Sequence, residues 1–236
     1  GTTSAIGSNL SKALRLNQKT RKLLIGCGAA AALSAIFKAP VAAIVFAMEV
    51  ILLDITTFSL IPLLLASVTA AMFSRLFFGN DLLFQFQIQE SIQFIDMPFY
   101  ILLGLLGGFV GVYFTKVNFL VSRIFGKMKK QPLKLLIGGL MLGLLIFLFP
   151  PLYGEGYTTV YHLISGNTSM VLENSQLEGL TDNIWVILGF LSLVIFFKAF
   201  ATSITFSAGG VGGIFAPTLF MGSIMGFVFS KFINLI

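Results

Sequence analysis

The sequence has 236 residues, of which 57% are hydrophobic and only 10% are charged, and its mean hydropathy is +0.97. Soluble domains carry roughly 25% charged residues, so this composition excludes a soluble globular protein and indicates an all-α, polytopic membrane protein. The net charge of +6 does not indicate nucleic acid as a partner, because the basic residues lie beside apolar segments, where they orient a chain in the lipid bilayer.

The chain opens with a predicted helix and a basic segment. TTSAIGSNLSKAL, residues 2–14, has the composition of the body of a helix. Because the sequence also stops inside an apolar run, we expect it to be the interior portion of a longer membrane protein. Five basic residues place this part on the cytoplasmic side by the positive-inside rule: Lys12, Arg15, Lys19, Arg21 and Lys22.

Two short apolar stretches follow, residues 23–37 and 40–53, and Pro40 separates them. Proline suits the first position of a helix, so we expect one helix to end before Pro40 and another to begin there. Each stretch would be roughly 21 to 23 Å long, shorter than a hydrocarbon core about 30 Å thick. The first contains GCGAAAALSAIF, whose small residues allow neighbouring backbones to come very close. We therefore predict a tightly packed pair of helices that do not each span the membrane.

Glu49 lies near the end of the second short stretch, inside an apolar run. An ionisable group in such a position is a candidate functional residue. The alternative is a solvated cytoplasmic helix end, and the sequence leaves both interpretations of Glu49 open.

Longer apolar segments predict spanning helices over residues 58–78, 99–121, 133–149 and 184–206. A second basic cluster indicates another cytoplasmic connection and consists of Arg123, Lys127, Lys129, Lys130 and Lys134. Two acidic segments, 79–98 and 150–183, contain no Lys or Arg and are expected to face outward. With these assignments the spans alternate in direction across the bilayer.

A glycine-rich break, SAGGVGGIFAP at residues 207–217, interrupts the last apolar region. Backbone groups freed at such a break need partners other than lipid, so the break should lie inside protein or at a watery cavity. A helix starting near Phe215 would direct its first amides, and a partial charge of about +0.5, at an anion. The competing interpretation is that the glycines only relieve crowding between packed helices.

The segment Gly213-Ile214-Phe215-Ala216-Pro217, preceded by SAGGVG, resembles the G-x-F-x-P anion-selectivity segment of the CLC chloride channels and chloride/proton antiporters. Upstream, GCGAAAALSAIFKAPVAAIVFAMEV, residues 26–50, is similar to the family's Gly/Ala-rich helix pair joined at an Ala-Pro turn. The resemblance covers essentially the whole chain. It implies a CLC-type transmembrane domain of two inverted halves with broken and short helices, in which residues 1–78 end the first half and 99–236 begin the second.

The same resemblance implies the site. Ile214 and Phe215 would offer backbone N–H groups to chloride or a similar small anion, while Gly213 and Pro217 shape the turn around Ala216. The family's gating glutamate is expected just upstream of Gly1, and its chloride-binding serine and tyrosine in segments outside this sequence. The resemblance also implies a homodimer, with an interface formed partly by the helix from Pro40 and the span 58–78.

Chloride transport through a multi-pass protein of a plasma or inner membrane is therefore the expected function. Family exchangers commonly carry a second acidic residue after the one matching Glu49, and here that position is Val50. This favours a channel, with a proton-coupled antiporter as the alternative and Glu49 as its possible proton route. Lys198 lies inside the span 184–206, where a charge should face protein or water. It is expected either to line the anion vestibule or to extend toward the membrane interface.

Two other classes are weaker alternatives. A membrane-embedded enzyme would need a cluster of catalytic or metal-ligating residues, and the sequence offers no His/Glu/Asp ligand cluster and no Ser/His or paired Asp arrangement within the membrane. A structural membrane segment without transport activity is the other. We expect no catalytic residue, no metal site and no cofactor.

Overall fold

A computed structural model of the chain describes residues 2–50, 57–79, 93–172, 175 and 183–235. Over these residues it consists of helices and connections, without strands, which confirms the predicted all-α class. The chain divides into two compact units, Gly1–Gln85 and Phe86–Ile236.

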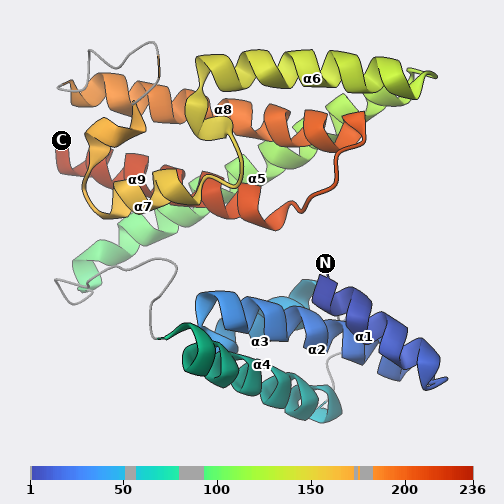
Figure 1. The fold of residues 1–236 in the computed structure, drawn as a ribbon. Coiled ribbons are helices and arrows are strands. Elements are labelled where there is room, and N and C mark those ends of the chain that lie inside the picture. The colour runs from blue at the N-terminus through green and yellow to red at the C-terminus, as the bar shows by residue number, and fades with distance from the viewer. Residues whose placement is uncertain (1, 51–56, 80–92, 173–174, 176–182, 236) are drawn as a thin grey trace. The chain divides into compact units, whose positions relative to one another are not determined.

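The first unit is built around its second helix. It comprises α1 (Thr2–Ala13), α2 (Gln18–Phe37), α3 (Pro40–Val50) and α4 (Thr57–Phe78) (Figure 1). Helix α2 packs against each of the other three. It ends where Lys38 takes a left-handed conformation with φ of 52°, and Pro40 then begins α3 as its first residue, as predicted.

Helix α2 corrects the prediction of two short helices. It begins at Gln18 instead of near residue 23, because the Asn17 side chain accepts a hydrogen bond from the Thr20 N–H at 2.9 Å and caps the helix there. The basic residues before position 23 are good helix formers and do not interrupt it. With 20 residues, α2 is long and apolar enough to cross a membrane. Only α3, with 11 residues, is short as predicted.

Helices α1 and α2 approach each other through two glycines. A Cβ atom added at Gly28 would lie 2.5 Å from the carbonyl oxygen of Thr3, and one added at Gly7 would lie 2.6 Å from that of Leu24. Neither position can carry a side chain without moving the helices apart. The predicted close packing of the glycine- and alanine-rich segment is therefore confirmed.

Side-chain hydrogen bonds join α2 to α4 inside this unit. The Ser34 hydroxyl donates to the Ser67 carbonyl at 2.6 Å, and the Ser74 hydroxyl donates to the Ala35 carbonyl at 2.7 Å. Beyond the helix end, the Lys38 ammonium donates to the Gly79 carbonyl at 2.6 Å. A cation close to the C-terminus of α4 also complements the partial negative charge of that helix end.

The second unit is organised around α8. Its elements are η1 (Phe94–Asp96), α5 (Met97–Gly126), α6 (Gln131–Leu148), η2 (Pro150–Leu152), α7 (Tyr157–Ile164), η3 (Thr168–Val171), α8 (Ile184–Ala208) and α9 (Phe215–Leu235). Helix α8 packs against α5, α6 and α9 (Figure 1). It is also the most buried of the apolar helices that the structure describes. The buried residues of α8 include three polar ones, Lys198, Thr202 and Ser203.

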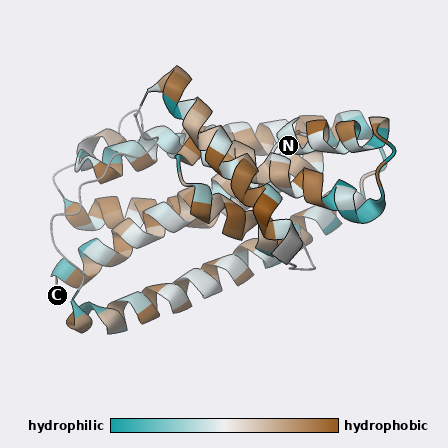
Figure 2. Ribbon diagram, turned by 90° about the horizontal axis from the view of Figure 1, so that it is seen from below, coloured by the Kyte–Doolittle hydropathy of each residue, from teal (hydrophilic) through white to brown (hydrophobic). Residues whose placement is uncertain are grey.

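Six of the described helices are long and apolar enough to cross a membrane. They include α4, α5, α6 and α8, which confirm the four longer predicted spans. Helix α5 continues five residues past the predicted end at 121, to Gly126. Figure 2 shows hydrophobic residues on several sides of these helices, between paler and hydrophilic stretches, as expected for helices that face both protein and lipid.

The glycine contact between α1 and α2 can be tested with a single methyl group. Replacing an interior helix glycine by alanine normally favours the helix by about 1 kcal/mol. At Gly28 the added methyl group meets the Thr3 carbonyl, so we expect Gly28→Ala to lower the free energy of unfolding by roughly 1 to 3 kcal/mol. Thermal unfolding of the purified protein in mild detergent measures the change.

Gly143→Ala in α6 is the matched control, because a Cβ atom added there meets no described atom within 4 Å. This variant should unfold at or above the temperature of the unmodified protein. Equal unfolding temperatures for Gly28→Ala and Gly143→Ala would contradict the tight contact.

Candidate functional site

The glycine-rich break lies between α8 and α9. Helix α8 ends at Ala208, and Gly209 follows with φ of 109°, a conformation that favours glycine. The Gly209 N–H donates to the Phe206 carbonyl at 3.1 Å, and the Gly210 N–H to the Thr205 carbonyl at 2.8 Å. These bonds satisfy the Thr205 and Phe206 carbonyls and end α8 at a glycine turn, and residues 209–214 that follow are exposed.

Helix α9 then begins at Phe215, as predicted. Its first backbone hydrogen bond runs from the Thr218 N–H to the Ile214 carbonyl at 3.1 Å. Pro217 has no N–H, so the donors of the first turn are the amides of Phe215 and Ala216, preceded by that of Ile214. The helix dipole adds a partial positive charge of about +0.5 at this end. Such a turn is suited to an anion.

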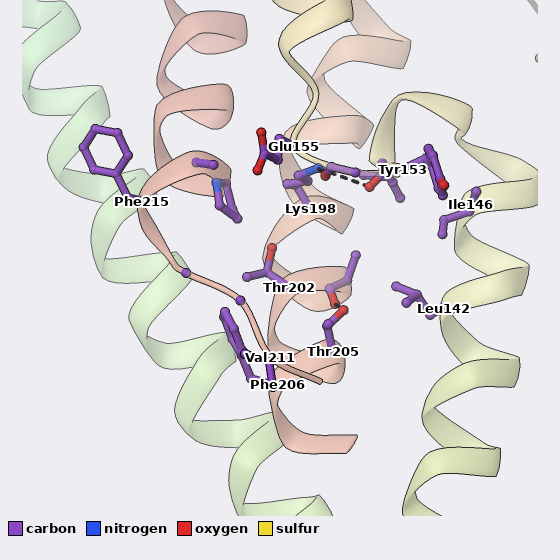
Figure 3. Close-up of a pocket in the computed structure, with 17 residues that line it drawn as sticks. Leu142, Ile146, Tyr153, Glu155, Lys198, Thr202, Thr205, Phe206, Val211 and Phe215 are labelled. Atoms are coloured by element: carbon purple, nitrogen blue, oxygen red, sulfur yellow. Dashed lines mark hydrogen bonds between the residues drawn. The ribbon is translucent and has the colours of Figure 1, made fainter. Parts of the chain in front are cut away.

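A pocket of about 520 Å³ lies beside the break. Its walls come from α6, the connection after η2, α8, the break itself and the start of α9 (Figure 3). Among the predicted site residues, Gly213, Phe215, Ala216, Pro217 and Lys198 line it. The structure therefore brings the predicted segment and Lys198 together around one cavity.

Two predicted residues lie elsewhere. Ile214 does not line the pocket, and its side chain is 56% exposed. Glu49 is exposed near the end of α3, in the first compact unit. Neither position contradicts the prediction, which assigned a backbone amide to Ile214 and a proton route to Glu49.

Lys198 is the most unusual side chain of the pocket, because it is only 2% exposed. Its ammonium donates to the Leu152 carbonyl at 3.1 Å and to the Gly154 carbonyl at 3.0 Å, and lies 4.5 Å from the centre of the Phe220 ring. These contacts exclude the alternative that Lys198 extends to the membrane interface. No ion pair joins it to a carboxylate among the described residues.

The pocket has a positive charge on its buried wall, where Lys198 lies. Glu155 also lines the pocket, but its side chain is exposed. Burial raises the pKa of the nearby Tyr157 phenol, and the negative charge of Glu155 raises it further. The negative field of Glu155 thus acts on the exposed side, while the buried cation lies deeper.

Sequence reasoning missed Thr202. It lies one helical turn after Lys198 on α8, is 7% exposed and lines the same pocket (Figure 3). The spacing of four residues from Lys198 places both on one helix face, and this signal was present in the sequence. The carbonyls of Leu152 and Gly154 were also missed, since no side-chain pattern marks a carbonyl that will bind a distant lysine.

Comparison with known proteins gives a consistent result. A protein family described as voltage gated chloride channel matches residues 1–236. A Ralstonia nicotianae protein named as a ClcB-like chloride channel protein is 31% identical over 96% of this chain and 49% of its own length. The voltage-gated ClC-type chloride channel ClcB of Escherichia coli O17:K52:H18 is 31% identical over 91% of this chain and 47% of its own length.

Solved structures share the fold. A slow cyanobacterial Cl⁻/H⁺ antiporter matches 99% of this chain and 52% of its own with a TM-score of 0.69 and 24% identity. A CLC-type fluoride/proton antiporter matches 97% of this chain and 67% of its own with a TM-score of 0.59 and 22% identity. The chain spans about half the length of the relatives it matches.

The family match over the whole chain agrees with the six apolar helices and with the glycine-rich break before α9. The chain is part of a multi-pass integral membrane protein, and it belongs to the CLC family of voltage-gated chloride channels.

Proposed function

We propose that this chain contributes to a pathway that moves chloride or a similar small monovalent anion across a plasma or inner membrane. The observation that carries the proposal is one pocket that combines the start of α9 with a buried ammonium, which pairs with carbonyls and with no carboxylate of the described residues. The names of the relatives, which are chloride channels, support the same substrate. Residues 1–78 and 99–236 would belong to the two inverted halves of the transport domain.

Within this proposal, the amides of Ile214 and Phe215 donate to the anion. Gly213 permits the backbone to turn, and Pro217 removes one N–H from the first turn of α9 without weakening the helix. Lys198 raises the electrostatic potential of the vestibule. The Lys198 charge is buried in protein, so water screens it less than it would a surface lysine.

We propose channel-like movement of the anion, with a proton-coupled antiporter as the alternative. The two solved structures described above are proton antiporters, whereas the relatives in sequence are named chloride channels, so the family fits either mechanism. Val50 favours the channel, since a valine can neither carry a proton nor hold one by a hydrogen bond. Glu49 is the adjacent group that a proton route would have to use.

We also propose a homodimer that uses α4. This helix exposes apolar side chains on one face, among them Ile61 at 64%, Leu65 at 58% and Met72 at 59%. Such a face can lie against a second copy of the same helix, because it contains no charged residue between positions 58 and 74.

The anion site is tested by bromide, whose anomalous scattering identifies it in crystals of the complete protein. We expect bromide within hydrogen-bond distance of the Ile214 or Phe215 amide, because the start of α9 lines the pocket and the N-terminus of a helix favours an anion. Bromide found only at lysine side chains, and never at these amides, would exclude the assignment.

The mechanism is tested in proteoliposomes with a chloride gradient, no proton gradient and a pH-sensitive dye inside. We expect chloride flux with little proton movement, since Val50 interrupts the proton route. The control is Glu49→Gln, which should leave chloride flux unchanged in a channel. Sustained uphill proton movement that Glu49→Gln abolishes would instead identify an antiporter in which Glu49 replaces the missing acid.

The dimer is tested by cysteine cross-linking in bilayers, after Cys27 is replaced by alanine to remove the native thiol. Single cysteines at positions 61, 65 and 72 should give dimers on oxidation. A cysteine at Leu63, which is fully buried inside the unit, serves as the negative control. A monomer in mild detergent and in bilayers alike, without cross-links at any exposed position, would refute the interface.

A further inference from the structure

Two polar side chains on α8 face the pocket from adjacent helical turns. Lys198 is 2% exposed and Thr202 is 7% exposed, and both line the cavity (Figure 3). Polar groups this deeply buried normally have hydrogen-bond partners within the protein. Lys198 follows this rule through its two carbonyl acceptors. The Thr202 side chain is mostly buried, but its hydroxyl oxygen is not fully enclosed by protein and is accessible from the pocket that the residue lines.

The Thr202 hydroxyl forms no hydrogen bond with any residue that the structure describes. Serine and threonine hydroxyls inside helices usually donate to a carbonyl in the preceding turn. The neighbours on α8 do so: Ser203 donates to the Ala199 carbonyl at 2.7 Å, and Thr205 donates to the Ala201 carbonyl at 2.8 Å. The Thr202 proton is therefore available to a ligand in the pocket.

The Lys198 ammonium is held by hydrogen bonds and forms no ion pair with a carboxylate among the residues that the structure describes. Of its three N–H donors, two are directed at the carbonyls of Leu152 and Gly154, and the Phe220 ring lies beside the nitrogen. The dipoles of two carbonyls hold the cation but do not cancel its charge. A buried charge without a paired opposite charge is costly, and an anion in the pocket would lower that cost. Lys198 thus supplies charge, and Thr202 supplies a hydrogen-bond donor.

We propose that Lys198 and Thr202 form a second anion station, distinct from the amides of Ile214 and Phe215, for a monovalent halide. The proposal rests on the proposed transport function and adds a coordinating side chain to it. One cation and one hydroxyl offer too few donors to replace the hydration of a divalent anion. The remaining wall is largely apolar and includes Leu142, Ile146 and Phe206, and the exposed carboxylate of Glu155 lies at the same pocket. A negative charge there repels a divalent anion more strongly than a monovalent one, so the station selects chloride or bromide over sulfate.

Thr202→Val tests the station, because valine keeps the shape of threonine and removes only the hydroxyl. Hydrogen bonds to charged groups are strong enough that we expect bromide affinity at this station to fall about tenfold. Anomalous diffraction from crystals of the complete protein, soaked in a series of bromide concentrations, measures occupancy at each position separately. Ser203→Ala is the control, since its hydroxyl is bonded to the Ala199 carbonyl and does not line the pocket.

The proposal predicts a bromide peak beside Thr202 that weakens in Thr202→Val and is unchanged in Ser203→Ala, while the peak at the Ile214 and Phe215 amides remains. A peak at the amides alone, or a Thr202 peak that the valine variant leaves intact, would overturn the station and leave the transport proposal standing. Bromide at neither position, together with an absence of chloride flux in proteoliposomes, would overturn both proposals. Lys198→Arg, which keeps the charge, should retain the Thr202 peak.

Discussion

The buried ammonium of Lys198 is the constraint on which the second unit depends. Taking a charged group out of water costs several kcal/mol unless other groups compensate it, and here the compensation comes from two distant parts of the chain. The carbonyl of Leu152 comes from the end of η2, that of Gly154 from the connection after it, and the Phe220 ring from α9. Gly156 has a positive φ of 82° and lies directly against Phe220, where a side chain would clash. One cation therefore fixes the positions of α8, α9 and the connection that closes the pocket.

Glycine serves two different physical purposes in this chain. Gly7 and Gly28 are helical, and they are needed because a neighbouring backbone occupies the space of a side chain. Gly209 is needed for a left-handed backbone conformation that ends α8. Gly7 and Gly28 let two helices come together, whereas Gly209 ends one helix and so separates it from the next. Only the second use exposes backbone amides to a ligand, so glycine content alone does not identify an anion site.

The long spans and the start of α9 were predictable from sequence, because apolar length and a break before Phe215 are local properties. The beginning of α2 differs from the predicted start near residue 23, although Asn17 is a local capping signal, because basic residues mark both a cytoplasmic connection and a helical turn. The partners of Lys198 could not be predicted. They are backbone carbonyls 44 and 46 residues away in the chain, and every residue carries a carbonyl, so no residue type distinguishes them. Thr202 could be predicted in part. Its spacing from Lys198 is visible in the sequence, but only the structure shows that its hydroxyl does not bond to a carbonyl of α8.

The number of donors around the pocket bears on the proposed transport of an anion. Conduction requires binding strong enough for the ion to enter and weak enough for it to leave. A second buried cation beside Lys198 would hold an anion tightly and would also have to be neutralised whenever the pocket was empty. A hydroxyl avoids both problems, because a neutral donor costs far less to leave without a ligand than a charge does. The carbonyls bonded to Lys198 also weaken anion binding, because their dipoles reduce the attraction between the ammonium and an anion while they hold the ammonium in place. A fixed cation moderated by carbonyls, with a single neutral donor one turn away, therefore suits an anion that must bind briefly and move on.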